Sequence, residues 1–308
     1  MRVLFADHEC HRKTRSADFF LEILRERFEL DLHYYSACYD CLMPDRLVER
    51  ADIVVFWEFL PGRRDICIPG KPCVFVPMYD NEWGSKWQWR RIARSGMGVI
   101  SFCDAVAAHA KSCGVENVLS VHYAPDPGRL EPSSGDPRKA LYWNRGNFSE
   151  RQIRSLFADG AIDELSVQTG FMPREEYDEF SGRFGVCVAP RRKEGIGMAF
   201  LEQLARGNCV IAHDDATMNE YIADGANGIL LDFDKPKRKI SAGEIAAVRK
   251  NARAFAFTAR KRWLAERDAI APFLMEAAKT PCAIPGRFGD WLRFAAYLAE
   301  GTAMRIFR

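Results

Sequence analysis

Two glutamates that flank two glycines form the part of this 308-residue chain best suited to chemistry. Glu194 is followed by Gly195 and Gly197, and Glu202 lies further along the same segment. Carboxylates accept hydrogen bonds from sugar and ribose hydroxyls, and glycines let the backbone approach a ligand closely. The segment therefore predicts a binding site for a hydroxylated ligand.

The residues around these glutamates place them between a strand and a helix. Residues 186–189 are an apolar run typical of a buried strand, and residues 199–206 have the periodicity of a helix. The N-terminus of a helix presents free N–H groups and the positive end of its dipole. We therefore expect this turn to hold the phosphates of a sugar nucleotide, with Glu194 on the loop and Glu202 in the helix.

Short β-rich runs alternate with helical patterns along the first part of the chain. Strict alternation of strand and helix predicts a parallel sheet covered on both faces. The expected strands are 3–6, 30–35, 52–57, 73–76, 99–102 and 118–122, and the expected helices are 16–27, 44–50, 83–94 and 105–113.

A segment rich in proline, glycine and serine, residues 123–137, interrupts this alternation and predicts an interdomain linker. A second α/β series follows it, and residues 241–279 are helical in composition. We expect an N-terminal domain over 1–127 and a nucleotide-binding domain over 128–285. A last amphipathic helix, within 286–308, should pack back on the first domain. The strands expected after the linker are 140–143, 165–169, 185–189, 209–212 and 228–231, and the helices are 149–158, 174–180, 199–206 and 218–223.

The bulk composition limits the classes of function. A chain of this length fits two ordinary domains, and a net charge of +2 gives no reason to expect a nucleic-acid partner. No signal peptide is visible at the N-terminus, and no apolar run approaches the roughly 20 residues that span a bilayer. Most of the ten cysteines lie in apolar runs, as in Cys73, Cys103, Cys187 and Cys209, and are interpreted as reduced core residues. We expect a cytoplasmic protein.

An ordered series of motifs extends beyond the two glutamates. Glu194-Gly195-Ile196-Gly197 is followed by Leu201-Glu202-Gln203-Leu204-Ala205 and then by the segments 207–212, 220–222 and 224–228. Their order and spacing resemble the retaining GT-B glycosyltransferases that share an E-x7-E motif, the family 4-like or "glycosyl transferases group 1" proteins. The series covers roughly fifty residues, whereas the first domain resembles the family only in its strand and helix rhythm.

This resemblance implies a GT-B fold, in which two Rossmann-like domains face a central cleft and helices end the chain. It implies transfer of a sugar from a nucleotide-diphosphate sugar, such as a UDP- or GDP-sugar, to a hydroxyl of a glycan or lipid-linked acceptor. Retention of configuration is expected, without a metal or other cofactor.

The resemblance also assigns roles within the second domain. Glu194 would contact the donor sugar, while Gly195, Ile196 and Gly197 would line the sugar and diphosphate and Glu202 would hold the ribose. Arg145 stands where the family usually has a phosphate-binding arginine. The family's later lysine position is Glu150 here, and Arg151 could substitute for it.

The first domain offers less certain site residues. The family often has a histidine after the fourth strand, near the reacting sugar, but here Tyr79 or Asp80 occupies that place. Because the loop after the first strand borders the cleft of such a fold, Asp7, His8 and Arg12 are expected on the acceptor side.

Several segments allow a structural interpretation as well as a functional one. His8, Cys10 and His11 together with Cys38 and Cys41 offer metal donors, but they come from different loops, so no metal site is expected. The basic run 235–239 is a solvated loop or, with the aromatic tail 291–308, a peripheral membrane contact. On the same fold, a sugar-nucleotide epimerase and a catalytically silent binding subunit remain alternatives.

Overall fold

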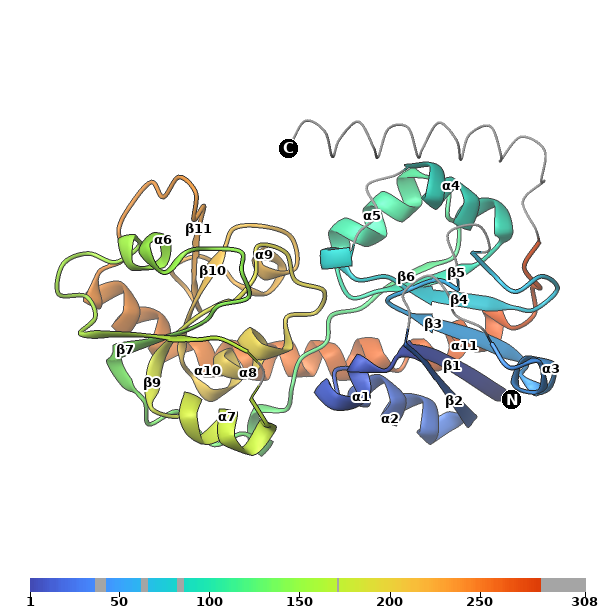
Figure 1. Ribbon diagram of the computed structural model, residues 1–308, viewed down its shortest axis with the longest axis horizontal. Coiled ribbons are helices and arrows are strands. Elements are labelled where there is room, and N and C mark those ends of the chain that lie inside the picture. The colour runs from blue at the N-terminus through green and yellow to red at the C-terminus, as the bar shows by residue number, and fades with distance from the viewer. Residues whose placement is uncertain (37–42, 62–65, 82–85, 171, 284–308) are drawn as a thin grey trace.

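The computed structural model describes residues 1–36, 43–61, 66–81, 86–170 and 172–283 (Figure 1). Two parallel sheets, each covered by helices, lie side by side in the view. The first domain contains a six-stranded sheet in the order β2-β1-β3-β4-β5-β6, and the second contains a five-stranded sheet in the order β11-β10-β9-β7-β8. The predicted fold class, two Rossmann-like α/β domains, is confirmed.

The first sheet is built from apolar runs that are buried on both faces. Every residue of β3, Ile53–Trp57, and of β4, Cys73–Val76, is buried, as expected for central parallel strands. The other elements of this domain are β1 Arg2–His8, α1 Cys10–Thr14, α2 Asp18–Arg27, β2 Glu29–Tyr35, α3 Asp45–Arg50, the 3₁₀ turn η1 Tyr79–Asn81, α4 Lys86–Ser95, β5 Gly98–Ser101, α5 Asp104–Ser112 and β6 Val118–Ser120.

The second sheet follows the linker and its 3₁₀ turn η2, Pro127–Arg129. Its helix α6 begins with a capping box, in which Ser149 and Gln152 satisfy each other's backbone N–H groups. The elements are β7 Asp136–Trp143, α6 Glu150–Ser155, β8 Glu164–Gln168, α7 Arg174–Ser181, β9 Phe184–Val188, α8 Met198–Arg206, β10 Cys209–His213, α9 Met218–Tyr221 and β11 Ile229–Leu231.

The chain then returns to the first domain earlier than predicted. Helix α10, Ala242–Arg267, runs from the second domain to the first in Figure 1, and α11, Ile270–Ala277, packs against α2 and β4. Cys282 exchanges backbone hydrogen bonds with Gly70 and Lys71. Residues 270–283, which were assigned to the second domain, therefore contact the first, because the apolar face of α11 is buried there. The predicted helix after residue 286 lies outside the described residues.

Sequence and structure also differ at the ends of several elements. Helix α1 was not predicted, because five polar or small residues carry no amphipathic period. The predicted strand 118–122 ends at Ser120, and the predicted helix 218–223 ends at Tyr221. Cys73, Cys103, Cys187 and Cys209 are buried and free, as predicted. No helix in the described part of the chain is long and apolar enough to cross a bilayer.

The linker is held by two arginines of α10. Arg253 donates hydrogen bonds to the carbonyl oxygens of Pro127 at 2.7 Å and Leu130 at 3.1 Å, and Arg260 donates to that of Ala124 at 2.9 Å. Irregular backbone between two domains needs such partners for its carbonyl groups. The long helix thus fastens the segment on which the two domains would pivot.

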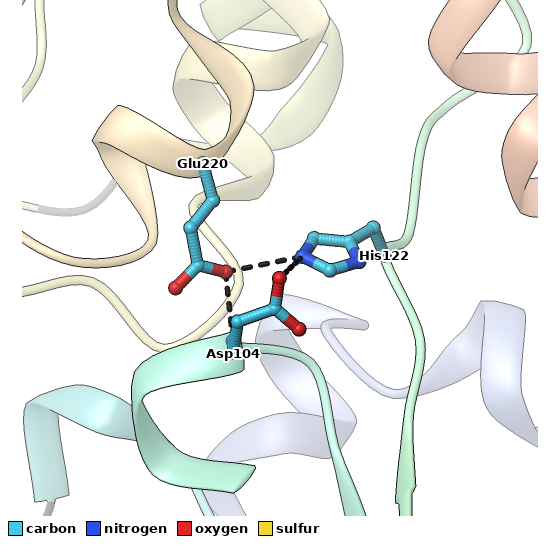
Figure 2. Close-up of side chains that lie close together, drawn as sticks. All are labelled: Asp104, His122 and Glu220. Atoms are coloured by element: carbon cyan, nitrogen blue, oxygen red, sulfur yellow. Dashed lines mark hydrogen bonds and ion pairs between the residues drawn. The ribbon is translucent and has the colours of Figure 1, made fainter. Parts of the chain in front are cut away.

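Glu220 of α9 joins the two domains. Its carboxylate accepts hydrogen bonds from the backbone N–H groups of Asp104 at 2.8 Å and Ala105 at 3.2 Å, which begin α5 of the first domain. The Nε2 atom of His122, which lies between β6 and the linker, is 3.1 Å from Glu220 and 3.4 Å from Asp104 (Figure 2). Burial alone would raise the pKa of Glu220, but the bonds from His122 and the α5 N–H groups lower it to about 2.

We predict that Glu220→Gln lowers the free energy of unfolding by about 1 to 3 kcal/mol, because charge-assisted hydrogen bonds to a helix end are lost. The folded-state pKa of Glu220 lies below its ordinary value of 4.5. The stabilisation is therefore complete above that pH and is lost as the pH falls towards 2. Urea unfolding from pH 8 to pH 3 measures both effects.

Glu179→Gln is the matched control, since that exposed glutamate of α7 pairs with Arg183 in the turn that follows the helix, at 3.5 Å. The gap between wild type and Glu220→Gln should be constant at neutral pH and shrink below about pH 4.5. A gap no larger than that of the control would contradict the role given to Glu220.

Candidate active site

The order of the strands determines where the site lies. In each sheet, chain crossovers leave in opposite directions from one pair of neighbouring strands, β1 and β3 in the first and β7 and β9 in the second. Ligands of open parallel sheets bind beyond the carboxyl ends of such strands. A cavity of about 350 Å³ is lined by residues that follow these four strands and by Met78 and Asp80, which follow β4.

A second cavity, of about 490 Å³, adjoins the first. Glu58, Asp80, Arg145 and Arg191 line both cavities. Two carboxylates of the first domain therefore face two guanidinium groups of the second. The shared walls make the two cavities one cleft between the domains.

Glu194 presents its carboxyl group to this cleft from the loop after β9. The residue is 8% exposed, and its side chain forms no hydrogen bond or ion pair with any other described residue. Burial raises the pKa of Glu194 to about 7, and the neighbouring Asp80 adds to this while Arg191 and Arg145 oppose it. A buried carboxyl group without a protein partner is costly unless a ligand completes its hydrogen bonds.

The glycines beside Glu194 shape the loop. Gly197 has a φ of +77° at the N-cap of α8, and a Cβ atom there would lie 1.9 Å from the ring of Phe200. A Cβ atom on Gly195 would lie 2.9 Å from Asp80 Oδ1. The N-terminus of α8 has no side-chain cap, and Met198 and Ala199 line the cavity. The predicted arrangement, a glycine turn leading into an open helix N-terminus, is present.

Arg145 follows β7 and lines both cavities. Its guanidinium group stacks 5.1 Å from the ring of Trp143 and forms no ion pair with any described residue. Burial, together with the charge of Arg191, lowers the pKa of Arg145. Such a cation gains free energy when an anion enters. Arg145 is thus brought to the cleft, as predicted.

Asp80 and Tyr79 connect the domains across the cleft. Asp80 pairs with Arg191, while its Oδ1 atom is buried without a hydrogen-bond partner. The hydroxyl group of Tyr79 donates to Asp215 at 2.8 Å, and Tyr79 does not line either cavity. Of the two residues predicted near the reacting sugar, Asp80 lines the cleft and Tyr79 does not.

The residues predicted on the acceptor side do not line the cleft, but a residue close to them in sequence does. Asp7 is fully buried and accepts a hydrogen bond from His11, His8 contacts the carbonyl of Ser36, and exposed Arg12 lies over the ring of Tyr34. None of the three lines the cavities, because each side chain is directed to the partner just named. His11 lines the cleft instead.

Two more predicted residues lie away from the cavities. Arg151 is exposed on α6 and lines neither cavity. The structure therefore gives no support to its predicted substitution for the family's lysine. Glu202 is buried on α8 and accepts from Arg174 at 2.9 Å, while its Oε2 atom accepts no hydrogen bond from a described residue. The contact of Glu202 with a ribose stays a prediction.

Sequence reasoning missed Glu58 and Arg191 as cleft residues. Arg191 lies in the basic run before Glu194, which could have indicated it. Glu58 directly follows the apolar strand β3, at the position where a strand meets the cleft. Without the strand order, nothing distinguished this loop from the other loops of the sheet.

Two clusters bring together groups that could bind a metal, Asp104 with His122 and Glu220, and His213 with Asp232 and Asp234. Arg262 donates to His122 Nδ1 at 2.7 Å, so Nε2 carries the proton that points to the carboxylates. Arg192 pairs with Asp234 in the second cluster. The Nε2–H group of His122 and the α5 N–H groups contact Glu220 in the first cluster, which leaves His122 Nε2 without a lone pair for a metal ion. We therefore propose no metal ion at either cluster. Cys38 and Cys41 lie outside the described residues.

Comparison with known families agrees with this geometry. Residues 161–263 match the family model described as "Glycosyl transferases group 1". The resemblance predicted from the motifs is confirmed over this segment. The D-inositol 3-phosphate glycosyltransferase of Acidothermus cellulolyticus is 29% identical to this chain over 91 residues, which cover 30% of this chain and 20% of that protein.

Solved structures resemble this chain over most of its length. Anabaena HepE in complex with UDP and glucose has a TM-score of 0.58 at 12% identity, and covers 90% of this chain and 100% of its own. A glycosyltransferase from Rickettsia africae has a TM-score of 0.58 at 13% identity, covering 91% and 99%. Sucrose-phosphate synthase from Thermosynechococcus elongatus has a TM-score of 0.57 at 12% identity, covering 90% and 98%. These likenesses confirm the GT-B fold.

We predict that Gly197→Ala lowers the melting temperature more than Gly160→Ala does. Both glycines have a left-handed backbone, with φ of +77° and +73°, which costs an alanine about 1 to 2 kcal/mol. A Cβ atom at position 160 meets nothing within 4 Å, whereas one at 197 must displace Phe200. Thermal unfolding of both variants gives the comparison. Equal losses would show that the loop accommodates a side chain.

Proposed function

We propose that this chain is a glycosyltransferase that moves a sugar from a nucleotide-diphosphate sugar to an acceptor hydroxyl, with retention and without a metal ion. The proposal rests on three features that lie in one cleft: the Glu194 carboxyl group, the Arg145 guanidinium group and the open N-terminus of α8. Neither Glu194 nor Arg145 forms an ion pair with another described residue. A hydroxylated, doubly anionic donor supplies what each of these groups lacks.

The cations around the cleft suit a leaving diphosphate. Arg145 comes from the loop after β7, and Arg191, Arg192 and Lys193 come from the loop after β9 to line the second cavity. When the bond to the sugar breaks, negative charge grows on the diphosphate, and fixed positive groups stabilise it without reorganising. In a metal-dependent enzyme, a bound metal ion would stabilise this charge.

The acceptor is the less defined substrate. We propose a glycan or lipid-linked hydroxyl, which approaches from the first domain, opposite the donor loop. In the basic run 235–239, Arg238 pairs with Asp224 and Glu244 of its own domain. A peripheral membrane contact through this run stays a proposal, and the tail after residue 283 lies outside the described residues.

A panel of UDP- and GDP-sugars, incubated with the protein with and without sugar acceptors, tests the proposed function. HepE was solved with UDP-glucose, which makes that donor the first to examine. We expect release of free nucleoside diphosphate that increases when a suitable acceptor is added. An epimerase would convert the donor without releasing nucleotide, and a silent subunit would bind without turnover. Absence of any binding to UDP, GDP or their sugars would refute the proposal.

The two glutamates of the donor segment should differ in their effects. Glu202→Ala should weaken binding of donor and free nucleoside diphosphate alike, by about 1 to 3 kcal/mol, if its contact is to the nucleotide. Glu194→Ala should leave nucleoside diphosphate affinity nearly intact and reduce turnover, because contacts to the moving sugar appear in the rate. Calorimetry with UDP or GDP and steady-state turnover measure the two effects.

Glu176→Ala is the control, because Glu176 is an exposed residue of α7 outside the cleft. Its affinity and rate should equal those of the wild type. Loss of nucleotide binding in Glu194→Ala with no effect of Glu202→Ala would show that the donor lies elsewhere in the cleft.

A further inference from the structure

Glu58 occupies an unusual backbone position at the wall of the cleft. It directly follows β3, at the topological switch point of the first sheet, and its φ is +64°. A residue with a side chain adopts this left-handed conformation at a cost of order 1 kcal/mol, and such residues cluster at functional sites. Glu58 also lines both cavities. The backbone conformation aims a carboxylate at the space that faces the donor loop.

A chain of hydrogen bonds holds the Glu58 carboxylate in place. His11 Nε2 lies 2.8 Å from Glu58 Oε2, His11 Nδ1 lies 2.6 Å from Asp7 Oδ1, and Asn81 donates to Glu58 Oε1. Burial alone would lower the pKa of His11, but its bonds to Asp7 and Glu58 raise it to about 10. The charged imidazolium therefore donates from both nitrogens, and neither remains for a substrate.

The Glu58 carboxylate retains capacity for a ligand. Each of its oxygens has accepted one hydrogen bond within the protein, and a carboxylate oxygen can accept two. With no free proton on His11, the group that can still contact an incoming molecule is Glu58. A hydroxyl group donates to this oxygen, whereas a phosphate oxygen would be repelled.

The rest of this wall agrees in its chemistry. Thr14 and Ser16 contribute hydroxyl groups, Trp57 contributes a ring, and the only cation that the first domain presents among the described lining residues is the paired His11. Glu58 and Asp80 on this wall outnumber the single positive charge of His11, so the wall is net negative. The guanidinium and ammonium groups of the cleft come from the second domain, and they belong to Arg145, Arg191, Arg192 and Lys193. The two walls thus separate a phosphate-binding side from a hydroxyl-binding side.

We infer that Glu58 binds a hydroxyl group of a neutral, polyhydroxylated acceptor, and that Asp7 and His11 are positioning residues that hold Glu58 for this contact. The inference rests on the proposed glycosyl transfer and adds the acceptor's chemical class and its contact. Donor hydrolysis, in which water replaces the acceptor, should not need Glu58.

The test compares Glu58→Gln and Glu58→Asn with wild type in three measurements. The measurements are UDP affinity by calorimetry, hydrolysis of UDP-glucose, and transfer of glucose from UDP-glucose to methyl glucosides and myo-inositol. If the wild type selects GDP-mannose as its donor, GDP and GDP-mannose replace UDP and UDP-glucose. Asparagine tolerates a positive φ, so the second variant keeps the backbone conformation. We expect at least a fivefold rise in acceptor KM in both variants, with UDP affinity and hydrolysis within twofold of wild type.

Further variants separate positioning from folding. His11→Gln should raise the acceptor KM in the same direction and leave UDP affinity unchanged. Glu49→Gln, an exposed carboxylate on α3 outside the cleft, should match wild type in all three measurements. Glucose 6-phosphate should be a poorer acceptor than the methyl glucosides for the wild type.

Two results would overturn the inference. One is an acceptor KM within twofold of wild type in both Glu58 variants, and the other is an equal loss of hydrolysis and transfer, which would place Glu58 with the donor. Failure of the wild type to bind any nucleotide would instead refute the proposed function. That result comes from the wild-type protein alone, so it is distinct from the outcome of the Glu58 variants.

Discussion

Parallel strands send every following loop to the same edge of their sheet, and the structure depends on two such edges facing each other. The first sheet contributes the residues after β1, β3 and β4, and the second contributes those after β7 and β9. Neither edge alone encloses a ligand. Facing edges create a cleft whose two walls belong to different domains, so that each substrate can be held by its own wall.

The charges of the cleft differ between the two walls. The second domain presents Arg145 and Arg191 beside the open N-terminus of α8, and the first presents Glu58 and Asp80. The buried Glu194 carboxyl group and the buried Asp80 Oδ1 atom lack protein partners among the described residues. Burying such groups lowers the stability of the empty protein. A ligand that completes their hydrogen bonds would remove this cost, which is the physical basis for our proposal that the donor binds here.

Contacts between the two domains lie both inside and outside the cleft. Glu220 of the second domain binds the first turn of α5 in the first, and α10 holds the linker through Arg253 and Arg260. None of these three residues lines either cavity. Asp80, which lines both cavities, pairs with Arg191 across the cleft. Separating the two walls would break the Asp80–Arg191 pair, whereas the contacts of Glu220 and α10 hold the domains together away from the ligand.

The local sequence was sufficient for those features that depend on neighbouring residues. Apolar runs predicted the strands, and the spacing of Glu194, Gly195, Gly197 and Glu202 predicted the glycine turn and helix of the second domain. Proline and glycine located the linker. These features follow from backbone conformation and hydrophobic period, which are encoded over a few residues.

Tertiary structure alone decided which loops meet. Asp7 and His8 follow the first strand, where the sequence predicts acceptor contacts, but the residue that lines the cleft is His11 of α1, which holds Glu58 from a different loop. Glu220 reaches α5 across more than a hundred residues of chain, and α11 joins the first domain because its apolar face fits there. Strand order and domain packing set these encounters. They depend on contacts distant in sequence, which no local pattern of residues records.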